Sequence, residues 1–189
     1  LAKVMEVNLD RMKSFTQGIL PLLVLIALVC GLIMLQPDLG TSFAIAGTAF
    51  FMMLVAGARW SHLGVIALSG AGLVTAAIAL ADYRLERFIA FLDPWKYPTD
   101  EGFQTIQSLY ALGSGGLFGM GLGRSRQKFF YLPEQHTDFI FAILGEELGF
   151  LGAFLVISLF LLFAWRGYRI AINAPDTFGS LLATGLTTM

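Results

Sequence analysis

Long apolar runs are the feature that most constrains what this chain can fold into. They cover residues 19–36, 41–58, 63–81 and 138–165, and a further run begins at residues 177–189. About 20 predominantly apolar residues cross a bilayer as a helix, because lipid offers backbone groups no outside partner. Hydrophobic residues make up 57% of the chain and charged ones 13%, with a mean hydropathy of +0.75. We therefore predict an all-α, polytopic membrane helix bundle over residues 1–189, and we expect it to be a piece of a longer protein.

Residues 82–137 form the one long stretch between predicted spans, and we expect them to be an extramembrane loop. Their middle, residues 106–122, is too short and too rich in glycine to span, yet too apolar to be freely solvated. The pattern predicts a helix followed by a strip that packs on the membrane or dips into it.

The charges near the span ends predict the orientation. The short-loop rule places basic residues such as Arg59 and Arg166 in the cytoplasm, whereas long loops cross largely regardless of their charge. The long loop and the turn at residues 36–40 are then extracytoplasmic. We expect a multi-pass membrane protein.

Some partners and cofactors are disfavoured by composition. The net charge is −1 and the basic residues are scattered, which argues against nucleic acid. Cys30 is the sole cysteine, so the chain has no internal disulfide. Neither His62 nor His136 has a second ligand at metal spacing, so we predict no metal site.

Two acids lie where the run at residues 138–165 begins. Glu134 and Asp138 are four residues apart and share one face if Pro133 starts a helix. Stabilisation by the helix dipole, about 0.3–1 kcal/mol, explains an acid there without any function. A carboxylate at a membrane–water boundary can instead act as a general base toward a sugar hydroxyl. Spacing leaves both readings open.

Glu146 and Glu147 lie two to three turns inside an apolar helix, where a charge costs roughly 3 kcal/mol on insertion scales. Such residues must be neutral, paired or facing a polar cavity. A structural pair with a group on a neighbouring helix is as plausible as a functional role.

Three cations, Arg124, Arg126 and Lys128, follow the glycine-rich strip at residues 113–123. Alternating cations beside exposed backbone N–H groups can hold a pyrophosphate, and a solvated charged strip is the competing reading. The glycines do not form a dinucleotide fingerprint, since no strand precedes them. Gly115 and Gly119 match the small-xxx-small spacing, although outside a full span.

Several ordered motifs together resemble one family, the SEDS cell-wall polymerases (shape, elongation, division and sporulation) of the FtsW, RodA and SpoVE type. The motifs are QPDLGT at residues 36–41, DPW at 93–95, GSGGLFGMGLG at 113–123, LPEQHTDFIFA at 132–142 and GEELG at 145–149. The sequence as a whole is most similar to the sporulation and division branch of this family.

This resemblance implies a fold of about ten helices in a bacterial cytoplasmic membrane and an enzyme that polymerises the disaccharide-pentapeptide of lipid II. Asp138 would be its catalytic general base, with Glu134 and His136 as helpers. The three cations, with Gln36 and Asp38, are our candidates for substrate binding. No cofactor is implied with certainty, although a divalent cation is compatible with the reaction. The implied partners are lipid II, the nascent glycan, a class B penicillin-binding transpeptidase and a division, elongation or sporulation complex.

Two other functions remain open. A transporter that flips a lipid-linked precursor would use Glu146 and Glu147 as a gating or proton-coupling pair. A non-catalytic scaffold would only position the transpeptidase. The polar constellation at the predicted outer surface favours the polymerase.

Overall fold

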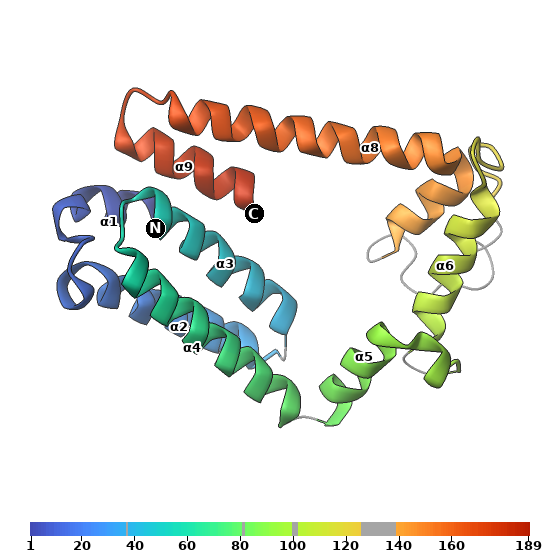
Figure 1. Cartoon of the computed structure of the whole chain (residues 1–189), viewed down its shortest axis with the longest axis horizontal. Helices are drawn as coiled ribbons and strands as arrows, with labels where there is room; N and C mark the ends of the chain where they lie inside the picture. The colour runs from blue at the N-terminus through green and yellow to red at the C-terminus, as the bar shows by residue number, and fades with distance from the viewer. Residues whose placement is uncertain (37, 81, 100–101, 126–138) are drawn as a thin grey trace. The chain divides into compact units, whose positions relative to one another are not determined.

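The computed structural model describes residues 1–36, 38–80, 82–99, 102–125 and 139–189, and these residues form helices and turns without a strand. The predicted all-α fold is confirmed. Figure 1 shows the elements, which are α1 (Ala2–Val7), η1 (Leu9–Arg11), η2 (Phe15–Ile19), α2 (Leu20–Met34), α3 (Leu39–Val55), α4 (Trp60–Ala79), α5 (Asp82–Leu92), η3 (Pro94–Lys96), α6 (Phe103–Gly115), α8 (Ile140–Ile172) and α9 (Thr177–Thr188).

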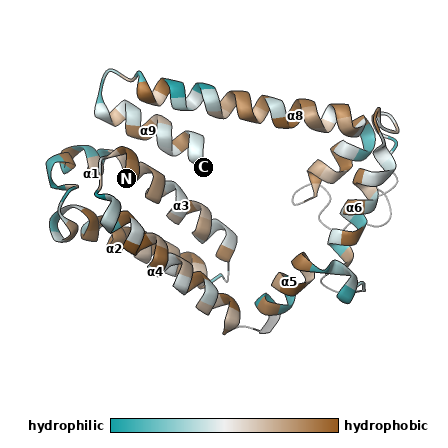
Figure 2. Ribbon diagram, in the orientation of Figure 1, coloured by the Kyte–Doolittle hydropathy of each residue, from teal (hydrophilic) through white to brown (hydrophobic). Residues whose placement is uncertain are grey.

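Within the described residues, three helical stretches are long and apolar enough to cross a membrane: Phe15–Met34, Trp60–Ala79 and Ile140–Ile172. Helix α3 is apolar but shorter. Figure 2 shows apolar residues along most of α2, α4 and α8. Only 6% of the apolar window in α4 is buried within the chain, so its side chains require lipid or further helices around them. The chain is thus built as a membrane protein.

The contacts divide the chain into two compact units, the first formed by Leu1–Ala71 with Leu161–Met189 and the second by Gly72–Phe160. In the first unit, α2 packs on α3, and α9 packs on both α1 and α3. Its core is rich in methionine, whose flexible side chain fills irregular gaps between helices. The fully buried members are Met5, Met12, Ile19, Leu22, Met53 and Leu181.

Aspartate residues cap the N-termini of two helices in the first unit. The Asp38 carboxylate accepts the Thr41 N–H at 3.0 Å where α3 begins. The Asp176 carboxylate accepts the Gly179 N–H, also at 3.0 Å, where α9 begins. Each cap satisfies a backbone donor that has no partner within its helix.

In the second unit, much of the predicted long loop is helical. The guanidinium of Arg84 in α5 donates to the carbonyl of Ala77 at 3.1 Å, which pairs one of the open carbonyls at the end of α4. The Trp95 ring of η3 meets the Tyr110 ring of α6 edge to face at 6.0 Å. Helix α6 is then followed by the glycine-rich strip, in the predicted order.

Candidate active site

Helix α8 is broken at Gly149, which has φ 68° and ψ −169° between two helical halves. A positive φ is strained for any residue with a Cβ. A Cβ at this position would also collide with backbone atoms of Gly119 and Leu117. Glycine is therefore required here on both counts.

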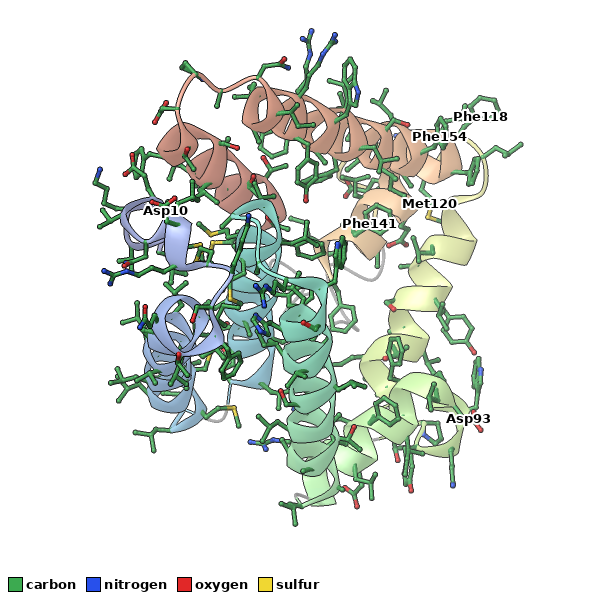
Figure 3. The ribbon with its side chains drawn as sticks, turned by 60° about the vertical axis from the view of Figure 1, so that its left-hand side comes forward. Asp10, Asp93, Phe118, Met120, Phe141 and Phe154 are labelled. Atoms are coloured by element: carbon green, nitrogen blue, oxygen red, sulfur yellow. The ribbon has the colours of Figure 1, made fainter. Side chains whose placement is uncertain are left out.

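The glycine-rich strip supplies the backbone partners that the break sets free. The hydrogen bonds are Phe150 N–H to Gly116 O at 2.8 Å, Leu151 N–H to Leu117 O at 3.2 Å, Met120 N–H to Glu146 O at 3.0 Å and Gly121 N–H to Glu147 O at 3.0 Å. Figure 3 shows Met120 beside α8. Since a buried backbone group without a partner is costly, the strip and the broken helix stabilise each other. We call residues 116–125 the docked strip.

Small residues allow this close approach. A Cβ on Gly115 would collide with the carbonyl of Gly145, and one on Gly119 with the carbonyl of Glu147. The small-xxx-small spacing of Gly115 and Gly119 thus brings backbone against backbone, as such spacings do between membrane helices.

The Glu146 side chain is buried in this contact, with 1% of its surface exposed. Its carboxylate accepts the hydroxyl of Ser125 at 2.5 Å, and Ser125 is also only 1% exposed. Glu146 therefore holds the docked strip twice, through its main-chain carbonyl at Met120 and through its carboxylate at Ser125. Of the options predicted for an acid inside an apolar helix, Glu146 is paired.

The neighbouring Glu147 differs. Its Oε1 atom is buried without a hydrogen-bond partner in the described part of the chain. Adjacent helical residues point about 100° apart, which explains why only one of the two acids reaches Ser125.

Arg124 is exposed between two anchored points of the docked strip. Its N–H donates to the carbonyl of Gly121 at 3.2 Å, which closes a tight turn, and Ser125 follows it directly. Its guanidinium thus extends from a fixed backbone. The other candidates of this region lie outside the described residues, namely Arg126, Lys128, Glu134, His136 and Asp138.

Gln36 and Asp38 belong to the first unit, where Gln36 is exposed at the end of α2. The Thr41 side chain donates to the Asp38 carboxylate at 2.6 Å. This bond, with the Thr41 N–H, holds the pKa of Asp38 below its usual range. Capping accounts for Asp38, and its role in substrate binding stays a prediction.

No group of three or more His, Cys, Asp or Glu side chains that could hold a metal ion occurs among residues 1–36, 38–80, 82–99, 102–125 and 139–189.

Ser125 and Gly149 are the site residues that sequence reasoning missed. Ser125 sits between two arginines, and its pairing with Glu146 bridges 21 residues of sequence. Gly149 stands in the GEELG motif, directly after the two acids and one leucine, and its sequence context does not distinguish it from Gly145, which is helical.

The described residues define an all-helical membrane protein in which a glycine-rich strip pairs with a broken helix. A family model matches this chain. The "Cell cycle protein" family, FTSW_RODA_SPOVE, matches residues 1–189. The chain belongs to this family, which confirms the resemblance drawn from its motifs.

Named relatives agree with this assignment. The chain is 53% identical to stage V sporulation protein E of Bacillus subtilis (strain 168) over 100% of its own length and 52% of the relative. It is 42% identical to a probable peptidoglycan glycosyltransferase FtsW of Geobacter sp. (strain M18), over 98% of this chain and 51% of that protein. The chain thus spans about half the length of these relatives.

The fold also matches a solved structure, that of a peptidoglycan synthase complex with coordinated polymerization and crosslinking. The TM-score is 0.73 at 30% identity, and the match covers 98% of this chain and 51% of the other.

Proposed function

We propose that this chain forms part of a peptidoglycan glycosyltransferase that polymerises lipid II in a bacterial cytoplasmic membrane. The observation that carries the proposal is the family match over the whole chain, together with relatives named as peptidoglycan glycosyltransferases. The helices with apolar outer surfaces suit an enzyme whose donor is a lipid.

In the proposed reaction, Asp138 takes the proton from the acceptor sugar hydroxyl. The hydroxyl oxygen bonds to the anomeric carbon of the donor, and the bond from that carbon to the pyrophosphate oxygen breaks with inversion. Undecaprenyl pyrophosphate leaves with the bonding electron pair. The guanidinium of Arg124, with Arg126 and Lys128, stabilises the charge on the leaving group.

The described geometry supports the cationic part of this mechanism. The docked strip presents the exposed Arg124 from a backbone that hydrogen bonds hold at Gly121 and Ser125. A fixed cation loses less conformational freedom on binding an anion than a free one does. Helix α8 begins at Ile140, two residues after Asp138 in the sequence.

The deciding measurement is glycan formation from purified lipid II, and it uses the full-length parent because this chain spans about half of its relatives. Asp138→Asn should abolish polymerisation in a folded protein, since the amide cannot accept the proton. Asp176→Asn is the matched control, because Asn still caps α9 and should leave the rate unchanged. Wild-type polymerisation by Asp138→Asn would rule out Asp138 as the base.

Glu147 favours a second candidate, a transporter that flips the lipid-linked precursor. A buried carboxylate oxygen without a partner in the described residues is typical of proton-coupled membrane proteins. In vesicles, Glu147→Gln would then block lipid translocation and spare polymerisation. If the protein is a polymerase and not a transporter, Glu147→Gln should leave lipid translocation unchanged.

A class B penicillin-binding transpeptidase is the proposed partner. The support is the similar chain from the solved synthase complex, in which polymerization and crosslinking are coordinated. The full-length parent and a purified class B transpeptidase should co-elute in detergent. Separate elution at micromolar concentrations would contradict the partnership.

A further inference from the structure

The pairing of Glu146 with Ser125 joins helix α8 to the docked strip. Glu146 lies on α8, and Ser125 ends the docked strip. Both side chains are 1% exposed, so neither is placed to meet a substrate itself. An acid kept inside an apolar helix is expensive, and a pure packing role would be filled better by an apolar residue.

The contacts show what this acid restrains. The Glu146 main chain holds Met120 and its carboxylate holds Ser125, so the segment between them is tied at both ends to one residue of α8. The turn from Gly121 to Arg124 lies inside this tether and is closed by its own hydrogen bond. Arg124 is exposed there and directly precedes the buried Ser125.

We propose that Glu146 is a positioning residue: by tying Met120 and Ser125 to α8, it sets the place from which Arg124 binds the pyrophosphate of the lipid-linked donor. The inference rests on the proposed function and adds a residue that acts through Ser125 rather than on the substrate. In this bond the hydroxyl of Ser125 is the donor and the Glu146 carboxylate the acceptor, so the Ser125 tether needs an acceptor oxygen at residue 146.

Steady-state kinetics of the full-length parent with lipid II test this role. Ser125→Ala and Glu146→Ala should raise KM for the donor, with a loss of about 10- to 100-fold in kcat/KM, the size expected from misplacing a binding group by about 1 Å. Glu146→Gln should lose less than Glu146→Ala, because its amide oxygen still accepts the Ser125 hydroxyl. The double variant Ser125→Ala with Glu146→Ala should lose less than the product of the two single losses, since the two side chains share one hydrogen bond.

Ser114→Ala is the matched control. Its hydroxyl donates to the Ala111 carbonyl within α6 at 2.9 Å, so its loss should leave KM unchanged. Ser125→Ala removes a single oxygen and keeps the test decisive even where Glu146→Ala fails to fold. In the Asp138→Asn background, lipid II binding measured directly should weaken in Ser125→Ala by the same factor as KM rises.

Three results would overturn the positioning role: a lowered thermal midpoint with unchanged KM, losses that multiply in the double variant, or a Glu146→Gln variant as impaired as Glu146→Ala. A wild-type parent that forms no glycan contradicts the proposed function instead. The two failures are therefore distinguishable.

Discussion

Gly149 shows how a single residue determines the shape of a helix. Alanine there would adopt a positive-φ conformation that is essentially confined to glycine, at a cost of about 1–3 kcal/mol, and would push its Cβ into Gly119 and Leu117. We expect Gly149→Ala to lower the thermal midpoint of the full-length parent, measured by size-exclusion chromatography of heated samples in detergent.

Gly113→Ala provides the matched comparison for that variant. A Cβ on Gly113 meets no atom within 4 Å, and α6 is helical there. Alanine should therefore be neutral or stabilise α6 by up to about 1 kcal/mol. Equal midpoints for Gly149→Ala and the wild type would contradict the requirement for glycine at the break.

Thr41 controls the titration of Asp38. The pKa of Asp38 is lowered in the folded protein, so its ionised cap stabilises α3 at pH values above the usual pKa of a carboxyl group. That stability is lost as the pH falls through the lowered pKa. Thr41→Val removes the side-chain donor and should raise the pKa of Asp38 toward its ordinary value, as followed by carboxyl-carbon NMR.

Ser42→Ala is the control for this titration. The Ser42 hydroxyl donates to the Asp38 main-chain carbonyl at 2.9 Å and not to the carboxylate, so the pKa should stay lowered. An unchanged titration in Thr41→Val would show that the Thr41 hydroxyl does not set the pKa.

Sequence reasoning at this scale was limited by distance along the chain. It identified Glu146 as an acid that needs a partner, because the cost of a charge in an apolar helix depends on local composition alone. It could not find Ser125, since that pairing depends on how the chain returns to α8.

At the scale of elements, local composition predicted helix α8 but not its break. An apolar run at residues 138–165 was sufficient to predict a helix, and the structure extends it to Ile172. The break was not predicted, because glycine in an apolar run is compatible with an unbroken helix, as Gly145 and Gly152 of α8 show. Whether it bends depends on the docked strip, which lies about thirty residues earlier in the sequence.

Helix α9 depends on Asp176, the N-cap residue that precedes it. Asp176→Ala removes the acceptor for the Gly179 N–H and should destabilise the parent by about 1 kcal/mol. Asp176→Asn keeps an acceptor and should cost less. Thermal unfolding of both variants in detergent provides the comparison, and equal midpoints for Asp176→Ala and the wild type would show that the cap contributes no stability.

At the scale of the whole molecule, the predicted orientation has a direct test. In a Cys30→Ser background, Lys96→Cys should react with a membrane-impermeant maleimide added to intact spheroplasts. Asn173→Cys should react only after permeabilisation, since it follows Arg166 and Arg169 at the predicted cytoplasmic end of α8. Both sites are exposed in the structure. The reverse pattern would invert the proposed topology.

The break in α8 also constrains the order in which the protein is built. Four backbone groups around Gly149 find their partners only in the docked strip, and leaving them unpaired in lipid or in a protein interior would cost several kcal/mol. During biogenesis, α8 should therefore bend only when it docks on the strip, which precedes it in the chain. Hydrogen exchange should reveal this sequence of events, with the amides of Phe150 and Leu151 becoming protected together with those of Met120 and Gly121.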